Sequence, residues 1–205
     1  MIKKAKLEIL NGLDMSKFKK QLLQDIGLHY ATKSKVYQIT LEAALKMSEA
    51  DLDACFNLIA YTSKSDYEQS KTRWRPKVKK AEMLHVDMRY FLVRADEEDS
   101  RILGFASFML THEADTEVIY LYEIHLSDPV RRIGLGKHLV DIVSEVGRNA
   151  GVEKLMLTVF TRNQHAVDWY SRMGFAVDDS WPEARTLRSG ITKQADYRIL
   201  SRSIS

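Results

Sequence analysis

Cysteine, proline and glycine are scarce in this sequence, and each shortage excludes a class of protein. The 205 residues include 1 cysteine, 3 prolines and 9 glycines. The single Cys55 cannot form an internal disulfide, which excludes a disulfide-stapled secreted domain and fits a reducing compartment. Because Cys55 lies in an apolar stripe at helical spacing, we expect a buried core residue rather than a reactive thiol. So few prolines and glycines leave little room for a disordered linker.

Long hydrophobic runs and a strong net charge are also missing. The first six residues contain too short an apolar run for a signal peptide, and nowhere do apolar residues extend over the roughly 20 positions that cross a bilayer. The formal charge of +3 is too small to indicate nucleic-acid binding. We therefore expect a soluble monomer of the nucleus and cytoplasm, without direct contact to nucleic acid or membrane. The basic run at 71–80 is interpreted as a solvated helix start rather than a nuclear-import signal.

What is present is typical of a globular domain, with 45% hydrophobic and 29% charged residues. Residues 1–34 are charged and carry apolar residues at helical spacing, so we predict an N-terminal helical extension that wraps a main domain of residues 35–205. Strands are predicted at 36–41, 90–93, 102–110, 118–126, 154–160, 175–177 and 197–200. Helices are predicted from the Ser48 cap to Tyr61, from Pro76 to about Met88, and at 134–150 and 163–173. A hairpin around a charged turn at 96–100, followed by alternating strands and helices, predicts a mixed α/β sheet.

A glycine-containing loop, Arg131-Arg132-Ile133-Gly134-Leu135-Gly136-Lys137, lies between a predicted strand and a predicted helix. Two glycines two positions apart let the backbone approach a ligand closely, and the free N–H groups of a helix start favour phosphate or pyrophosphate. A Rossmann fingerprint would need a third glycine where Leu139 stands. A P-loop would need glycine at Arg131 and serine or threonine at His138. A glycine-rich turn without a ligand stays open at this point.

The spacing of this loop resembles motif A of the GNAT acetyltransferases, a superfamily whose loop holds the pyrophosphate of coenzyme A. A second motif follows at the superfamily's distance, because Asn163, Ala166, Tyr170, Gly174 and Phe175 match its motif B. Alone, this stretch would be an ordinary helix capped by Asn163. Together the two motifs imply a GNAT fold: a mixed, mostly antiparallel sheet with flanking helices, here with the N-terminal helical extension. They also imply acetyl-CoA as co-substrate.

Further stretches narrow the resemblance to the histone-specific N-terminal acetyltransferases of that superfamily. The matching segments are 67–70, 117–126, 155–160, 178–180 and 197–202. This resemblance implies transfer of acetyl to the α-amine of Ser-Gly at the start of histones four and two-A. Histone N-terminal tails are therefore the expected partners.

The same resemblance implies which residues form the site. Coenzyme A would contact the strand end, the glycine-containing loop and the motif B asparagine, which are Ile124, His125, Leu126, Arg132, Ile133, Gly134, Leu135, Gly136, Lys137 and Asn163. The peptide N-terminus would contact Tyr67, Thr111, His112, Glu113, Tyr122, Thr158, Ser180 and Tyr197. Thr111 departs from the pattern of these histone-specific enzymes, which have an acidic residue there, so one acidic contact to a basic tail is not expected here.

Glu123 is the residue whose type and place suggest catalysis, with Tyr122 and Tyr197 as partners that hold the peptide or relay a proton. An attacking α-amine must lose a proton, and Glu123 stands in an apolar strand, where an ionised glutamate is costly without a partner. We predict that Glu123 is the general base, acting through water; an edge-strand or salt-bridged glutamate is the alternative. Strict alternation would put Glu123 on the opposite face from Tyr120 and Tyr122, so a shared site requires a bulge.

Two further features carry open alternatives. Glu113, Asp115 and Glu117 form an acidic cluster that either meets a basic histone tail or is a solvated loop. The histidines have no metal-ligand spacing, so no metal site is expected. The rival functions are a GNAT enzyme that acetylates a lysine or small amine, and a coenzyme A-binding interaction module without turnover.

Overall fold

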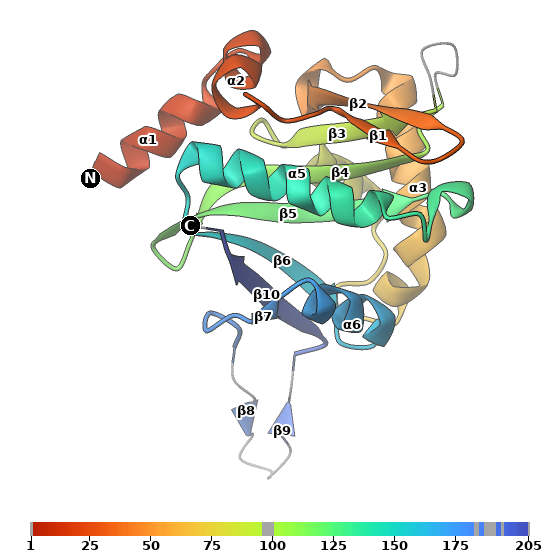
Figure 1. The fold of residues 1–205 in the computed structure, drawn as a ribbon. Helices are drawn as coiled ribbons and strands as arrows, with labels where there is room; N and C mark the ends of the chain where they lie inside the picture. The colour runs from red at the N-terminus through yellow and green to blue at the C-terminus, as the bar shows by residue number, and fades with distance from the viewer. Residues whose placement is uncertain (1, 96–100, 183–184, 187–191, 194, 205) are drawn as a thin grey trace.

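The structure, a computed structural model, describes residues 2–95, 101–182, 185–186, 192–193 and 195–204 (Figure 1). An 8-stranded sheet has the order β1-β2-β3-β4-β5-β6-β10-β7. Its strands are β1 (His29–Ala31), β2 (Val36–Ala43), β3 (Arg89–Arg94), β4 (Gly104–Glu113), β5 (Thr116–Leu126), β6 (Lys154–Phe160), β7 (Ala176–Val177) and β10 (Tyr197–Ser203). A separate small pair joins β8 (Arg185–Thr186) and β9 (Thr192–Lys193). Of the eight-stranded sheet's pairs, β5 with β6 is parallel and the others are antiparallel, which confirms the predicted mixed, mostly antiparallel sheet.

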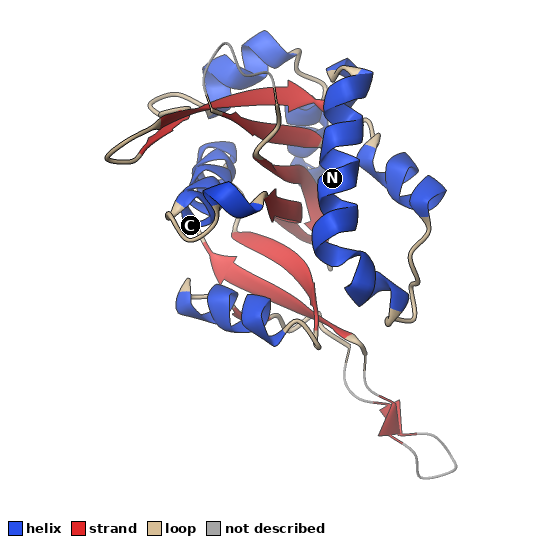
Figure 2. Cartoon of the chain, turned by 90° about the vertical axis from the view of Figure 1, so that its right-hand side faces the viewer, coloured by secondary structure: helices blue, strands red, loops and turns tan. Residues whose placement is uncertain are grey.

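Helices cover both faces of this sheet (Figure 2). They are α1 (Ile2–Asn11), α2 (Met15–Leu22), α3 (Glu49–Glu68), α4 (Pro76–Met83), α5 (Leu135–Ala150) and α6 (Gln164–Arg172), with short 3-10 turns η1 (Ala44–Lys46) and η2 (Asp128–Val130). One core packs α1, α2, α5 and α6 against the first face. A smaller core packs α3 and α4 against the second face. No helix among the described residues is long and apolar enough to span a membrane.

Most predicted elements are confirmed. Ser48 caps α3, since its Oγ accepts a hydrogen bond from the Asp51 N–H at 3.1 Å. Cys55 is fully buried in the smaller core, and burial raises the pKa of its thiol, as expected for an unreactive core residue. The helix that starts at Pro76 ends at Met83 rather than near Met88. The predicted charged turn at 96–100 lies outside the described residues.

The N-terminal extension is helical only in part. Residues 29–31, which were predicted within the helical extension, form β1 and pair with β2 in the sheet. The helices α1 and α2 bury Leu7, Leu10, Phe18 and Leu22 in the larger core. The buried Arg89 guanidinium lies 4.1 Å from the Phe18 ring centre and donates to backbone and side-chain oxygens of Asn11, which ties the extension to β3. The division of the chain at residue 34 stays a prediction.

Candidate active site

Strands β5 and β6 part from each other near the middle of the sheet. Within the described residues they pair in parallel only from Val118 with Lys154 to Leu121 with Leu157. Beyond this point β5 continues to Leu126 beside β4, while β6 diverges from it (Figure 1). The backbone edge of β5 at 122–126 therefore faces an opening, where its N–H and C=O groups can bind a ligand.

A β-bulge lies at this opening. Ser107 pairs with Glu123 but Phe108 pairs with Leu121, so Tyr122 is the extra residue on β5. Alternation on either side of the bulge turns Tyr120, Tyr122 and Glu123 to one face, the face covered by α3 and α4. The bulge that a shared site requires is therefore present.

Glu123 is nearly buried, with a side-chain exposure of 10%, and both of its carboxylate oxygens have partners. The Lys79 ammonium lies 2.8 Å from Oε1, and the Tyr67 hydroxyl donates to the same oxygen at 3.3 Å. The His125 Nε2 lies 2.6 Å from Oε2, and its Nδ1 lies 2.6 Å from the Thr62 Oγ1. Glu123 is thus a salt-bridged glutamate inside the site.

These partners decide the charge of Glu123. Burial alone would raise its pKa, but the hydrogen bond and charge of His125 and the Lys79 ammonium outweigh burial and lower the pKa to about 2. Burial would also lower the pKa of Lys79, whereas the negative charge of Glu123 raises it above its ordinary value. Because an α-amine has a pKa of about 8, a carboxylate held this low is a weak acceptor for its proton. General-base action by Glu123 stays a prediction, and these contacts favour another role.

Hydroxyl and aromatic groups line the same face. The Tyr120 hydroxyl and the Thr158 Oγ1 on β6 are 2.6 Å apart, and the rings of Tyr120 and Tyr122 are centred 5.1 Å apart. Burial raises the pKa of Tyr122 to about 12, with Tyr120 and Glu113 adding to the shift. Tyr197 pairs with Phe160 at the start of β10, so it borders the same opening from the next strand. The predicted peptide contacts Tyr122, Thr158 and Tyr197 are thus brought together.

The other predicted peptide contacts have different outcomes. The register places Thr111 and Glu113 on the face of Tyr120, and the charge of Glu113 helps to raise the pKa of Tyr120. The Ser180 hydroxyl donates to the Asp178 carboxylate at 2.6 Å, and the same carboxylate accepts from the Ser180 N–H at 2.9 Å, so Ser180 lies in a turn held by Asp178. His112 lies on the opposite face, beside α1, so its side chain points away from the opening.

The acidic cluster is divided by the same alternation. Glu117 is 5% exposed and lies 3.6 Å from the Lys6 ammonium of α1, so it neither is solvated nor can meet a tail. Residues 114–115 form the exposed turn between β4 and β5. Of the predicted cluster, Glu113 alone combines a place at the site face with partial exposure.

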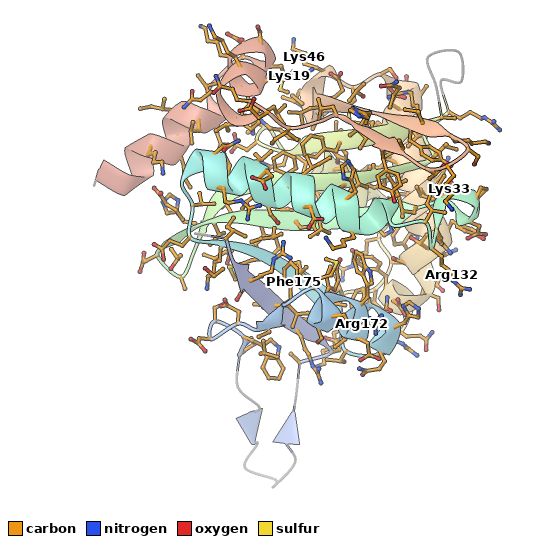
Figure 3. All side chains as sticks on the ribbon, viewed as in Figure 1. Lys19, Lys33, Lys46, Arg132, Arg172 and Phe175 are labelled. Carbon is orange, nitrogen blue, oxygen red and sulfur yellow. The ribbon has the colours of Figure 1, made fainter. Side chains whose placement is uncertain are left out.

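The glycine-containing loop leads into the start of α5, as predicted. Gly134 has φ +92°, a left-handed conformation that favours glycine. A Cβ added there would lie 2.5 Å from the Tyr30 hydroxyl, which itself donates to the Ile133 carbonyl. The His138 Nε2 lies 3.1 Å from the His29 carbonyl, so β1 supports this loop from outside. Arg132 in the loop and Lys33 on the β1–β2 turn lie at the same edge of the molecule (Figure 3).

The remaining predicted coenzyme contacts are also located. Ile124, His125 and Leu126 pair with β4 and lie beyond the described pairing of β5 with β6, but the His125 side chain is turned inward to Glu123. Leu135 is fully buried, and the exposed Lys137 ammonium lies 2.6 Å from Asp141 on the same helix, so its contact with coenzyme A stays a prediction. Asn163 caps α6: its Oδ1 accepts from the Ala166 N–H at 3.1 Å, and its Nδ2 lies 3.3 Å from Asp66.

Sequence reasoning missed three residues that the structure places at the site: Thr62, Trp74 and Lys79. Trp74 packs at a tilt against Tyr67, with 5.4 Å between ring centres. Lys79 belongs to the basic run that was interpreted as solvated, yet its side chain is 7% exposed. Its position four residues before the buried Met83 is the signal that would have placed it on the inner face of α4. Among the described residues, no group of histidine, cysteine and acidic side chains could hold a metal ion.

Comparison with known proteins agrees with this arrangement. N-alpha-acetyltransferase 40 of Saccharomyces cerevisiae is 30% identical over 165 residues, which cover 67% of this chain and 56% of that protein. The chain spans about half the length of the curated relatives that it matches first.

Solved structures share the fold at lower identity. The ribosomal-protein-S18-alanine N-acetyltransferase of Escherichia coli has a TM-score of 0.54 and 19% identity, covering 82% of this chain and 95% of its own. The PaiA N-acetyltransferase of Thermoplasma acidophilum, in complex with coenzyme A, has a TM-score of 0.56 and 16% identity, covering 81% and 99%. The acetyltransferase (GNAT) family model matches residues 51–175. Because that match spans more than half of the chain, the protein belongs to the acetyltransferase (GNAT) family.

Proposed function

We propose that this protein is an N-terminal acetyltransferase that moves acetyl from acetyl-CoA to the N-terminal serine amine of histone tails, as N-terminal acetyltransferase D does. The bulge at Tyr122 carries the proposal, because it gathers tyrosines and a carboxylate where β5 and β6 part. The N-alpha-acetyltransferase name of the yeast relative supports an α-amine as acceptor. Substrates that begin Ser-Gly, as in histones four and two-A, follow from the sequence resemblance.

The coenzyme side of the reaction is supported by backbone geometry. The edge of β5 at 122–126 is unpaired toward the opening among the described residues, and it leads directly to the loop before α5. Free N–H groups at a helix start favour the pyrophosphate of acetyl-CoA. A fold neighbour in complex with coenzyme A supports acetyl-CoA as the co-substrate. Acetyl-CoA is the proposed co-substrate, and the proposed chemistry needs no metal.

The acceptor side uses the polar face described above. In the proposed reaction the neutral α-amine attacks the thioester carbon, the carbon–sulfur bond breaks, and the proton that the nitrogen loses on becoming an amide is balanced by the proton that the leaving coenzyme A thiolate takes up. With an α-amine pKa of about 8, a sizeable fraction of substrate reaches the site neutral by losing its proton to water. Tyr122, whose pKa is about 12, stays protonated and can donate a hydrogen bond to charge that develops during transfer. Tyr197 and Thr158 border the place where the first peptide residue would lie.

Selectivity for a basic tail would depend on the charge at the edge of the acceptor pocket. Thr111 offers no charge, so Glu113 would be the carboxylate that meets the arginine of a Ser-Gly-Arg-Gly start. Histone tails as partners also imply a place in the nucleus and cytoplasm. A GNAT enzyme that acetylates lysine or a small amine remains the second candidate, because uncharged Thr111 weakens the match at the tail-binding edge.

Release of coenzyme A tests turnover. A peptide that begins Ser-Gly-Arg-Gly should release free thiol from acetyl-CoA at a rate well above the rate without peptide. A lysine-containing peptide with a blocked N-terminus and a polyamine serve as rival acceptors in parallel reactions. Release with the rival acceptors alone would favour the second candidate, and binding of coenzyme A without any release would indicate an interaction module.

A further inference from the structure

The side chains around Glu123 form a network that the proposed chemistry does not require. Lys79 on α4 lies at one carboxylate oxygen, at 2.8 Å, and His125 on β5 lies at the other, at 2.6 Å. We propose that Lys79 and His125 are positioning residues that fix Glu123 as an anion, which then holds Tyr67 in the acceptor pocket instead of removing a proton. This inference rests on the proposed function and assigns roles within the same site.

Lys79 is placed to serve Glu123 rather than solvent. Its side chain is 7% exposed, and its ammonium also lies 2.6 Å from the half-exposed Glu82 on the same helix. The ammonium stands 4.9 Å from the centre of the Tyr67 ring, so it contacts both groups that it would position. A buried ion pair is a costly way to stabilise a fold, since apolar side chains of similar size often do as well. The placement of this pair beside the acceptor pocket fits a role in the site better than a role in stability alone.

His125 fixes the second oxygen from the opposite direction. The ring is 8% exposed, and its Nδ1 lies 2.6 Å from the Thr62 Oγ1 on α3. The same Thr62 Oγ1 lies 2.9 Å from the Leu58 carbonyl, which ties the hydroxyl to the backbone of the helix. The orientation of the ring is therefore set at both nitrogens, and Glu123 cannot rotate without breaking these contacts.

Tyr67 connects Glu123 to the acceptor pocket. Its hydroxyl donates to Glu123 at 3.3 Å. Its ring packs against Trp74 and against Phe160 at the end of β6, and the Tyr67 and Phe160 ring centres are 5.0 Å apart. Tyr67 is a predicted peptide contact, and it joins α3 to the opening between β5 and β6. The charged and titratable groups that face Glu123 are Tyr67 from α3, Lys79 and Glu82 from α4, Tyr90 from β3, His125 from β5 and Tyr170 from α6.

A double-mutant cycle separates positioning from general-base catalysis. Glu123→Gln alone leaves the buried Lys79 ammonium with Glu82 as its one remaining carboxylate partner among the described contacts, so both the melting temperature and kcat should fall. Glu123→Gln combined with Lys79→Met removes both charges and keeps an amide that can accept from Tyr67. If Glu123 positions Tyr67, the double variant regains the melting temperature and at least tenfold in kcat over the single variant. If Glu123 is the base, the double variant stays as slow as the single one, because glutamine accepts no proton, and the inference is overturned.

The pH profile is a second readout that a purely structural role would not move. The peptide α-amine, with a pKa of about 8, sets the acid limb of kcat/KM in both proteins, so the readout is the ratio of Lys79→Met to wild type at each pH. This ratio should fall as the pH is lowered, because Glu123 without the Lys79 ammonium takes up a proton at a higher pH than in the wild type. The matched control is Lys80→Met on the same helix, whose ammonium pairs with Asp53 outside the site at 2.6 Å. A ratio that does not change with pH in Lys79→Met, or an equal fall in the control, would contradict the inference.

A binding-independent measurement keeps this test separate from the proposed function. Carbon-13 NMR of labelled glutamate carboxyls, assigned with Glu123→Gln, follows the ionisation of Glu123 without any substrate. An upward shift of its titration midpoint in Lys79→Met supports the positioning role even if no N-terminal amine is acetylated by the wild type. A wild-type Glu123 that titrates like an exposed glutamate would refute the role even if the acetylation assay succeeds.

Discussion

The contact between β1 and the loop before α5 gives the sharpest prediction about coenzyme binding. Gly134→Ala places a Cβ on a residue with φ +92° and 2.5 Å from the Tyr30 hydroxyl. The left-handed conformation costs a non-glycine residue about 1–2 kcal/mol. Displacing Tyr30 also breaks its hydrogen bond to the Ile133 carbonyl, which contributes about 0.5–1.5 kcal/mol. If this strain falls on the binding conformation of the loop, the Kd for coenzyme A should rise by roughly 10- to 300-fold.

Removing the Tyr30 hydroxyl distinguishes this cause from direct crowding of the coenzyme. Tyr30→Phe alone loses only the hydrogen bond, so the Kd should rise by roughly 2- to 13-fold. In the double variant Gly134→Ala and Tyr30→Phe, the two substitutions remove the same hydrogen bond, so its loss counts only once. The new Cβ then lies 3.5 Å from the nearest ring carbon of residue 30, an ordinary contact distance. The double variant should therefore bind coenzyme A about as well as Gly134→Ala alone.

Isothermal titration calorimetry with coenzyme A measures these affinities, and circular dichroism confirms that each variant is folded. Tyr37→Phe on β2, which pairs with Tyr30, is the matched control and should leave the Kd unchanged. Strictly additive losses in the double variant would refute the reasoning. They would mean that a side chain at Gly134 crowds the pyrophosphate itself.

Three further predictions concern stability and selectivity. The pKa of Glu123 is lowered to about 2, so its stabilising contribution is present above the unfolded-state pKa of about 4.3 and is lost as the pH falls toward 2. The melting temperature of the double variant Glu123→Gln and Lys79→Met should therefore fall less steeply than that of the wild type over this pH range. Lys6→Ala removes the ammonium beside buried Glu117, so the free energy of unfolding measured by urea titration should fall by about 1–3 kcal/mol while kcat stays unchanged. A loss of kcat without a loss of stability would contradict this prediction. Replacing the first serine of the peptide by leucine should reduce kcat/KM by an amount equivalent to about 1–3 kcal/mol, and equal turnover would indicate a broad acceptor site.

The sheet and its helices were largely predictable because periodicity and caps are local signals. The exact agreement at Lys154–Phe160 reflects an apolar run bounded by a glycine and by a helix cap. The short strand β1 was not predictable, because its 3 residues show no alternation and only the pairing with β2 makes them a strand. Helix α4 ends early for a similar reason, since the turn at 84–88 leads into β3 rather than continuing the helical pattern.

The site was predictable in its backbone and less so in its charges. The motifs located the loop at Gly134 and the capping role of Asn163. A bulge was expected because strict alternation would have put Glu123 on the opposite face from Tyr120 and Tyr122. The partner of Glu123 was not predictable, because Lys79 lies 44 residues earlier in a run of basic residues. Glu117 misled in the opposite direction: a charged residue next to a turn is usually solvated, yet packing of α1 covers it.

Mass spectrometry of acetylated peptides tests the central claim most directly. The protein is incubated with acetyl-CoA and a synthetic peptide that begins Ser-Gly-Arg-Gly and contains lysine, beside the same peptide with a blocked N-terminus. The account predicts a single added acetyl group, located by fragmentation on the N-terminal serine, and no product from the blocked peptide. Acetylation of the lysine in both peptides, or no acetylation of the free N-terminus, would contradict it.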